Sequence, residues 1–183
     1  MNGTGDAPVV RVATPADIPA ITAIYALHVA TGTASFEVEP PGADEMLRRF
    51  REIVDRGLPY LIATLPAAPQ SIAGYAYASV YRTRIAYRYT LEDSVYVDPA
   101  FARRGIGRLL LDTLIRACEP LGYRQMLAVI GGSDNAASIG VHAALGFERV
   151  GTFNAVGRKF DRWVDTVLMQ RALGSGSTTA PST

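Results

Sequence analysis

The chain has 183 residues, of which 49% are hydrophobic and 19% charged, a composition typical of one globular domain. Lys and Arg number 18 and Asp and Glu 17, so the net charge of +1 gives no reason to expect nucleic acid or an anionic membrane as a partner. The single cysteine, Cys118, excludes an internal disulfide. Besides this cysteine the chain has only two histidines, His28 and His142, so we predict no metal site.

The two ends of the chain differ in composition from its middle. The first residues, MNGTGDAPVV, have neither a basic start nor an apolar core, so they do not resemble a signal peptide. No run reaches the ~20 apolar residues of a membrane span, so we expect a cytoplasmic protein. We predict a flexible N-terminus at 1–8 and one folded domain at 9–173. The tail at 174–183 contains only Gly, Ser, Thr, Ala and Pro and is expected to be disordered.

The first half of the chain alternates strand and helix patterns. A helix starts at Thr14-Pro15-Ala16-Asp17, where Thr14 and Asp17 suit a capping box, and it stops at Gly32. His28 lies on or near the apolar stripe of this helix, where a packed or capping role is favoured over a functional one. The other predicted elements are strands at 9–13, 60–65 and 72–81 and a helix at 43–56.

The second half continues the alternation. Strand 124–130 is nearly all apolar, which predicts burial on both faces. Segment 156–164 is too irregular for a simple hairpin. Strands alternating with helices predict an α/β or α+β sandwich with helices on the faces of the sheet. The remaining predicted elements are strands at 94–97, 147–152 and 164–173 and helices at 107–119 and 135–145.

The most informative motif is Arg103-Arg104-Gly105-Ile106-Gly107-Arg108, which follows a strand and opens a helix. The glycines let backbone N–H groups turn toward one point, and the helix N-terminus adds partial positive charge, so the loop suits a pyrophosphate. It is not a Walker loop, because no Gly-Lys-Ser/Thr follows, and Leu110 breaks the dinucleotide fingerprint. Taken alone, the motif fits a tight turn with solvated arginines equally well.

A second signature follows about thirty residues later, where Asn135-Ala136-Ala137-Ser138 opens a helix that ends at Leu145-Gly146-Phe147. Together the two signatures resemble the Gcn5-related N-acetyltransferase (GNAT) superfamily over residues 9–172. The resemblance implies acetyl-CoA as co-substrate and a mixed, mostly antiparallel, twisted sheet flanked by helices on both faces. Ala102 departs from the Gln or Arg usual at the first position of the loop. The implied cofactor-binding residues are Val95, Tyr96, Val97, Arg103, Arg104, Gly105, Ile106, Gly107, Arg108, Asn135, Ser138 and Ala144.

Four further segments, 31–37, 82–97, 135–142 and 156–163, resemble the phosphinothricin / methionine sulfoximine N-acetyltransferases within that superfamily. The resemblance implies that Glu92 is the catalytic base and that His142 assists catalysis. It also implies that the arginine-bearing segment and an aromatic loop hold a small amine acceptor. The acceptor-binding residues predicted here are Phe36, Arg82, Thr83, Arg84, Tyr87, Thr90, Asp93 and Ser94.

The chemistry agrees with these assignments. Amide formation needs a neutral amine, so a base has to remove a proton from the acceptor. Apolar neighbours of Glu92 favour a raised pKa. Arg82 and Arg84 are two residues apart, so they point the same way in an extended segment and suit a carboxylate or phosphinate. Without the resemblance, Glu92 is interpreted as an ordinary carboxylate at the end of a strand, and Arg82 and Arg84 are interpreted as solvated surface side chains.

Several alternatives remain open at this level. Many members of the superfamily have a tyrosine acid where this chain has Phe147, so His142 and Tyr96 are the candidates for the acid. The acceptor is either the amino-acid-like amine or a peptide N-terminus or another small amine, and a non-catalytic acyl-CoA-binding module is the third reading. A homodimer is expected from the resemblance, with 156–164 in the dimer contact or capping the acceptor pocket.

Overall fold

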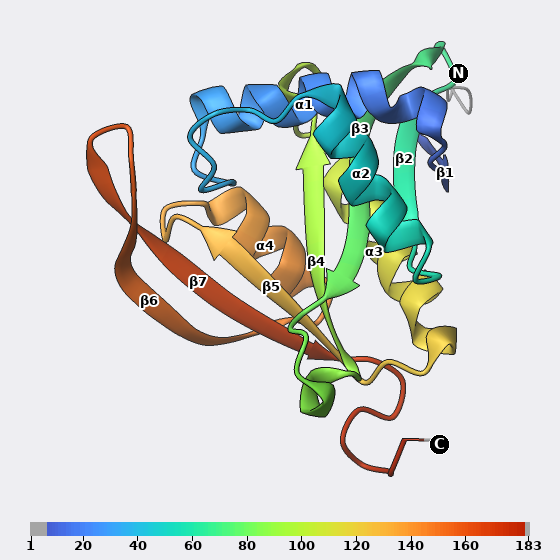
Figure 1. Ribbon diagram of the computed structural model, residues 1–183, viewed down its shortest axis with the longest axis vertical. Coiled ribbons are helices and arrows are strands. Elements are labelled where there is room, and N and C mark those ends of the chain that lie inside the picture. The colour runs from blue at the N-terminus through green and yellow to red at the C-terminus, as the bar shows by residue number, and fades with distance from the viewer. Residues whose placement is uncertain (1–6, 182–183) are drawn as a thin grey trace, which may run out of the picture.

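The computed structural model describes residues 7–181 and has one seven-stranded sheet. The strand order is β1-β2-β3-β4-β5-β7-β6, and every neighbouring pair is antiparallel except β4 and β5, which are parallel (Figure 1). The predicted mixed, mostly antiparallel sheet is therefore confirmed. The strands are β1 Val9–Val12, β2 Tyr60–Leu65, β3 Ala68–Val80, β4 Thr90–Val97, β5 Gln125–Gly131, β6 Glu148–Lys159 and β7 Arg162–Ala172.

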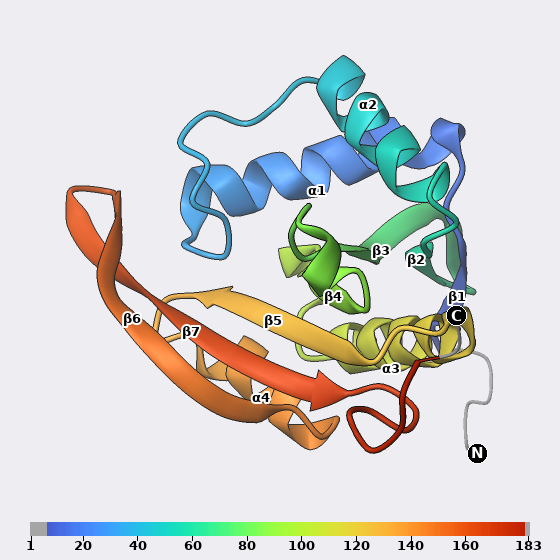
Figure 2. The same ribbon diagram turned by 60° about the horizontal axis from the view of Figure 1, so that its bottom comes forward.

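Helices cover both faces of the sheet, as predicted. The helices α1 (Ile18–Thr31) and α2 (Ala43–Val54) lie on one face, and α3 (Ile106–Cys118) and α4 (Ala136–Ala144) lie on the other (Figure 2). Short 3-10 turns occupy Pro15–Asp17, Ile85–Tyr87, Pro99–Phe101 and Glu119–Leu121. Within residues 7–181, none of the helices has the length and apolarity needed to cross a membrane.

The local sequence explains how the elements begin and where they pack. The Asp17 carboxylate accepts a hydrogen bond from the backbone N–H of Thr14 at 2.7 Å. This bond is part of the predicted capping box at the start of the helical segment that leads into α1. Arg11 donates to the same carboxylate at 2.8 Å. In α3, Leu110 and Leu114 are fully buried against the sheet because they lie on its apolar stripe.

Strand β5 differs from the prediction in its burial. Met126, Ala128 and Ile130 are buried under α3 and α4, whereas Val129, on the opposite face, is 41% exposed. The reason is that α1 and α2 cover β2 to β4 and leave this face of β5 open (Figure 2). The prediction of burial on both faces is therefore wrong, and the open face lies beside the cleft described below.

The segment 156–164 is irregular only at its start, and from Gly157 onward it is part of a regular hairpin. Gly157, Arg158 and Lys159 pair with Val164, Trp163 and Arg162, and the ladder closes in a two-residue turn at 160–161. Both turn residues have positive φ, which matches the twist of the two strands. The irregularity lies before the hairpin end, where the register shifts between Phe153 and Gly157. The turn residues, Phe160 and Asp161, are not the Asn-Gly pair that usually marks such a turn in a sequence.

The C-terminal tail contacts the start of β5. Arg124 donates hydrogen bonds to the Oγ of Ser175, to the Oγ1 of Thr179 at 3.1 Å and to the carbonyl of Ala180 at 3.0 Å. Residues 174–177 form turns and 178–179 form bends beside this arginine. Residues 1–6 of the expected flexible N-terminus, and residues 182–183, lie outside the described residues.

Candidate active site

The candidate site is a cleft that opens where β4 and β5 separate. The two strands pair only from Thr90 to Glu92 on β4 and from Gln125 to Leu127 on β5. Beyond these pairs the facing edges of the strands diverge, so their backbone N–H and C=O groups are free to pair with an extended ligand that carries amides. The cleft has a volume of about 230 Å³. Its walls are Ala34, Tyr77, Glu92, Asp93, Ser94, Val95, Tyr96, Ala128, Val129, Ile130, Gly131, Asn135, Ser138 and His142.

The Gly/Arg loop lies at the N-terminus of α3, as predicted. Gly105 caps the helix with φ 76°, a left-handed conformation that disfavours any side chain. Gly107 brings the first turn close to β4, since a Cβ there would lie 3.5 Å from Cγ2 of Val97. The first turn of a helix has backbone N–H groups without intrahelical partners, so this end of α3 suits a phosphate.

The side chains of the predicted loop residues divide into two groups. Arg103, Arg104 and Arg108 are exposed, so their guanidinium groups are available to an anion. Ile106 is 1% exposed and packs in the core, so only its backbone faces the loop. The backbone of Val97 makes a contact between two elements. Its carbonyl oxygen accepts a hydrogen bond from Nε2 of His28 at 2.8 Å, which connects α1 to the end of β4.

The helix α4 supplies one wall of the cleft. Asn135 caps this helix, because its side chain accepts a hydrogen bond from the N–H of Ser138 at 3.2 Å. Asn135 and Ser138 both line the cleft, as predicted. Ala144 is exposed in the last turn of α4 and does not line the cleft.

Glu92 lies on β4 with its side chain on the face that α1 and α2 cover. It is directly opposite Ser79 of β3, just as Ser94 is opposite Tyr77, so these side chains share one face. Burial raises the pKa of Glu92, the negative charge of Asp93 raises it further, and the positive charge of Arg82 lowers it. A half-buried carboxylate with a raised pKa in a cleft is suited to accepting a proton near neutral pH.

The predicted arginine pair lies in a groove next to the Glu92 face. Arg82, Thr83 and Arg84 line this groove, which has a volume of about 540 Å³, and Ser79 is also in its wall. Because Ser79 is directly opposite Glu92 on the sheet, the groove adjoins the carboxylate. Its other walls are Glu52, Ile53, Arg56, Leu58, Val80, Ile85, Arg88 and Tyr123.

Two more predicted acceptor residues, Tyr87 and Thr90, lie beside this region without lining either cavity. Tyr87 is 37% exposed on the connector and packs edge-on against Tyr81 at 5.6 Å between ring centroids. Thr90 is the first residue of β4. Of the predicted acceptor residues, Ser94 therefore lies in the cleft on the same face as Glu92, and Arg82, Thr83 and Arg84 lie in the adjoining groove.

Asp93 occupies a different place from the one predicted. Its side chain points to the α3/α4 face, where Oδ2 is 3.0 Å from Nε2 of His142. The two side chains are only 2% and 6% exposed. The structure therefore brings Asp93 together with His142, whereas Glu92 and Ser94 lie on the opposite face of β4.

The loop between α1 and α2 closes one side of the cleft because glycines of the sheet let it approach. A Cβ on Gly131 would lie 1.9 Å from the carbonyl oxygen of Thr33, and a Cβ on Gly157 would lie 2.3 Å from the Phe36 ring. Lys159, which is 5% exposed, donates to the carbonyl of Ser35 at 2.8 Å. The hairpin thus holds Phe36, which is 41% exposed, next to the cleft.

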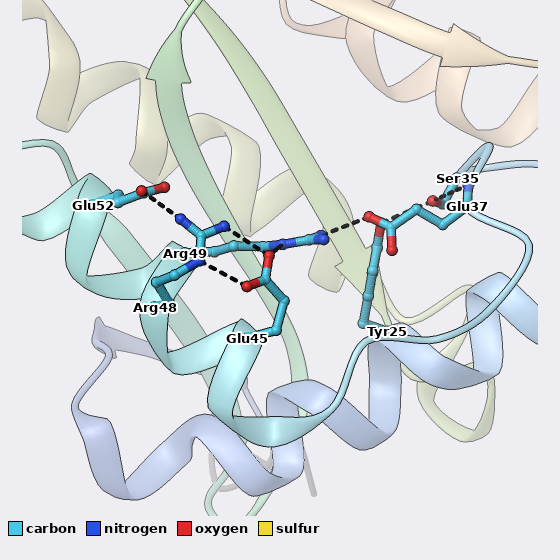
Figure 3. Close-up of polar contacts among 7 residues, drawn as sticks. All are labelled: Tyr25, Ser35, Glu37, Glu45, Arg48, Arg49 and Glu52. Atoms are coloured by element: carbon cyan, nitrogen blue, oxygen red, sulfur yellow. Dashed lines mark hydrogen bonds and ion pairs between the residues drawn. The ribbon is translucent and has the colours of Figure 1, made fainter.

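A chain of polar contacts holds the same loop from the other side (Figure 3). Glu37 accepts hydrogen bonds from Arg49 of α2 at 2.6 Å and from the Tyr25 hydroxyl of α1 at 3.1 Å. The Tyr25 hydroxyl also bonds Ser35 at 2.8 Å. Arg49 is in turn held by Glu45 at 2.7 Å. Figure 3 shows Tyr25 of α1 and Arg49 of α2 pointing toward Glu37 of the loop, so the position of the loop depends on both helices.

Some residues of the site were not among the predicted site residues. Ala34, Tyr77, Ala128, Val129 and Gly131 line the cleft because of strand pairing between distant segments. Of these residues, Tyr77 was the easiest to predict, because the side chains of β3 alternate between its two faces and Tyr77 shares a face with Tyr75. Within residues 7–181, no group of three or more His, Cys, Asp or Glu side chains is arranged to hold a metal ion.

Comparison with known proteins gives consistent results. The model of the family described as "Acetyltransferase (GNAT) family" matches residues 21–147. A phosphinothricin N-acetyltransferase of Alcaligenes faecalis is 55% identical over 172 residues, covering 94% of this chain and 86% of that protein. An L-methionine sulfoximine/L-methionine sulfone acetyltransferase of Pseudomonas paraeruginosa is 38% identical, covering 88% and 92%.

A solved structure extends the similarity to the fold. The crystal structure of a GNAT superfamily phosphinothricin acetyltransferase from Sinorhizobium meliloti, in complex with AcCoA, superposes with a TM-score of 0.92. The two chains are 45% identical, and the match covers 96% of this chain and 93% of that one.

Proposed function

Since the chain belongs to the GNAT family of acetyltransferases, we propose that this acetyl-CoA-dependent enzyme acetylates the amine of a small, amino-acid-like acceptor of the phosphinothricin, methionine sulfoximine or methionine sulfone type. The observation that carries the proposal is the position of Glu92, whose pKa is raised by burial, between the β4/β5 cleft and the arginine groove. The names of the relatives support the same class of acceptor.

The residues fit acetyl-CoA in two respects. The exposed Arg103, Arg104 and Arg108 and the N-terminus of α3 suit the pyrophosphate. The diverging edges of β4 and β5, with Asn135 and Ser138 on one side, suit the amide-bearing pantetheine arm. When bound, acetyl-CoA supplies the thioester from which the acetyl group is transferred.

We assign the acceptor side by charge. Arg82 and Arg84 hold the acceptor's carboxylate or phosphinate with charge-assisted hydrogen bonds. Phe36 and Tyr87 flank the acceptor, while Thr83, Thr90 and Ser94 bind its polar atoms. An acidic groove suits polycationic acceptors, so the arginines argue against a polyamine or an aminoglycoside.

Glu92 carries the proton chemistry. It accepts a proton from the acceptor's ammonium group, which leaves the nitrogen with the lone pair that attacks the thioester. A backbone N–H on the open edge of β4 donates to the carbonyl oxygen as that oxygen becomes negative. The thiol of coenzyme A is a good leaving group with an intrinsic pKa near ~8.5, so its departure needs little acid assistance.

We also propose a cytoplasmic homodimer that clears toxic amino-acid analogues. The support for dimerisation is apolar exposure on the hairpin, where Phe153 and Val156 are each 55% exposed and Trp163 is 66% exposed. Sedimentation of the wild type and of Trp163→Glu tests this. We expect a dimer and a weakened dimer respectively, and a wild-type monomer contradicts the proposal.

The acceptor is tested by thiol release from acetyl-CoA with phosphinothricin, methionine sulfoximine, methionine sulfone and a short peptide with a free N-terminus. We expect turnover with at least one amino-acid analogue and a much lower kcat/KM with the peptide. Turnover with the peptide alone supports a peptide acceptor instead. Binding of acetyl-CoA without turnover on any amine supports an acyl-CoA-binding module and overturns the proposal.

A further inference from the structure

A buried carboxylate–imidazole pair joins β4 to α4 at the wall of the cleft. The Oδ2 of Asp93 lies 3.0 Å from Nε2 of His142, and the side chains are 2% and 6% exposed. The Phe147 ring packs edge-on against the imidazole, with 5.0 Å between centroids. Both residues of the pair line the cleft that Glu92 also lines.

The contacts of the ring define where its protons are. Nδ1 of His142 lies 2.7 Å from the carbonyl oxygen of Ser138, which only accepts, so Nδ1 carries a proton. Nε2 faces the carboxylate of Asp93, so one further proton lies between these two atoms. Burial opposes a charge on His142, but the hydrogen bond and the negative charge of Asp93 outweigh it and raise the pKa of the ring. Both ring nitrogens thus face an acceptor, so a protonated ring has both of its N–H groups engaged in this position.

Fold stability does not account for this pair. Oδ1 of Asp93 is buried without a hydrogen-bond partner among the described residues, and an unsatisfied buried carboxylate oxygen destabilises a fold. Well-packed apolar residues commonly replace a buried ion pair without loss of stability. A buried pair with an orphan oxygen at a cleft therefore indicates a role in the reaction.

The other titratable groups around the pair are negative or neutral. Glu92 is next to Asp93 on β4, and its pKa is raised in part by that carboxylate. Cys118 of α3 is fully buried, and burial first, then the charge of Asp93, raises its pKa to about 12, so the thiol is neutral. His142 of α4 is thus the positive member of this group.

We propose that Asp93 is a positioning residue that keeps the imidazole of His142 doubly protonated and so holds a fixed positive charge at the wall of the reaction cleft. The inference rests on the proposed function. In the reaction the bond between the acceptor nitrogen and the acetyl carbon forms, the carbon–sulfur bond breaks, and coenzyme A leaves as a thiolate. The ammonium proton goes to Glu92 before the attack, and the second proton that the nitrogen loses as the amide forms goes to the departing thiolate, which is released as the thiol. His142 gives up no proton, and its charge stabilises the negative charge that develops on oxygen and then on sulfur.

The protonation state is tested directly by NMR of the imidazole nitrogens. The chain has two histidines, so His142→Gln identifies the resonances of His142 and leaves those of His28 as an internal control. We expect both nitrogens of His142 to carry protons at pH 7.5 in the wild type. In Asp93→Asn we expect the ring to be neutral at the same pH. A neutral His142 in the wild type overturns the proposal, and this measurement needs no activity.

The role in the reaction is tested by the pH profile of kcat/KM for the wild type and Asp93→Asn. We expect a loss of about tenfold or more at pH 8, a smaller loss at lower pH where the ring regains its proton, and an unchanged Kd for acetyl-CoA. A loss equal at every pH indicates a structural effect and overturns the proposal. If the wild type turns over no amino-acid acceptor, the proposed function fails. The NMR measurement still shows whether His142 is doubly protonated beside Asp93.

Discussion

The two sides of the cleft are built from different parts of the protein chain. The proposed pyrophosphate part of the cofactor site uses consecutive residues from the end of β4 to the first turn of α3, and it offers mainly backbone N–H groups and exposed arginines. The acceptor side uses side chains from the α1–α2 loop, α2, the β3–β4 connector and the hairpin. Backbone geometry therefore determines one side, and long-range packing determines the other.

This difference has a functional consequence. A phosphate needs only a helix N-terminus and positive charge, which a short motif provides. A particular small amine needs side chains of the right charge and shape at fixed distances. Changes on the acceptor side are therefore expected to alter KM for the acceptor, and changes in the loop are expected to alter the affinity for acetyl-CoA.

Among the residues proposed to bind the two substrates, the largest effect is expected for Arg82→Gln. Loss of a charge-assisted hydrogen bond to the acceptor is expected to raise its KM about 10- to 100-fold. The positive charge of Arg82 also lowers the pKa of Glu92, so its removal raises that pKa. Glu92 acts only when ionised, so the acidic limb of the kcat/KM profile moves to higher pH. A profile with an unmoved acidic limb contradicts the account of Glu92.

A change in the loop is expected to affect the other side. Gly105 has φ 76°, a conformation that a β-branched residue adopts rarely. In Gly105→Val the backbone of the loop has to turn away, and we expect the Kd for acetyl-CoA to rise about tenfold. Calorimetry measures the Kd. The acceptor KM at saturating acetyl-CoA serves as the control and is expected to change little.

The hairpin provides a smaller change on the acceptor side. A Cβ at Gly157 would lie 2.3 Å from the Phe36 ring, so Gly157→Ala forces this half-exposed ring to move. We expect the acceptor KM to rise severalfold while the Kd for acetyl-CoA is unchanged. Gly42 offers a matched control, because a Cβ there meets no atom within 4 Å. An equal effect of Gly42→Ala contradicts the interpretation.

The smallest effect is expected from the polar network of α2. Arg49 bonds Glu37 and Glu45, whereas Arg48 bonds only Glu45 and Glu52 on the surface of the same helix. Arg49→Gln releases Glu37 from α2, and we expect a two- to threefold rise in the acceptor KM. Arg48→Gln is the control, since exposed ion pairs contribute only about 0–1 kcal/mol. Equal acceptor KM values for the two variants exclude a role for this network.

The sequence predicted the elements and the cofactor loop well because these depend on local patterns. Strand β2 runs from Tyr60 to Leu65 as predicted, and the loop motif lies at the start of α3. The strand β4 begins at Thr90, four residues before the predicted start, because its early residues pair with both β3 and β5. Such pairing depends on segments distant in the chain.

The acceptor side was predicted only in part for the same reason. The partners Asp93 and His142 are 49 residues apart, and Lys159 and Ser35 are 124 apart. No spacing in the sequence indicates these contacts. The resemblance identified Asp93 as a residue of the site, but only the fold shows that its side chain points away from Glu92 and toward α4.

The central claim, that Glu92 is the base of an acetyl transfer, is tested most directly by kcat of Glu92→Gln together with its affinity for acetyl-CoA. Glutamine has nearly the same shape and cannot take up the proton, so we expect kcat to fall about 10²-fold or more while the Kd for acetyl-CoA is unchanged. A variant that binds acetyl-CoA normally and turns over at close to the wild-type rate contradicts the account.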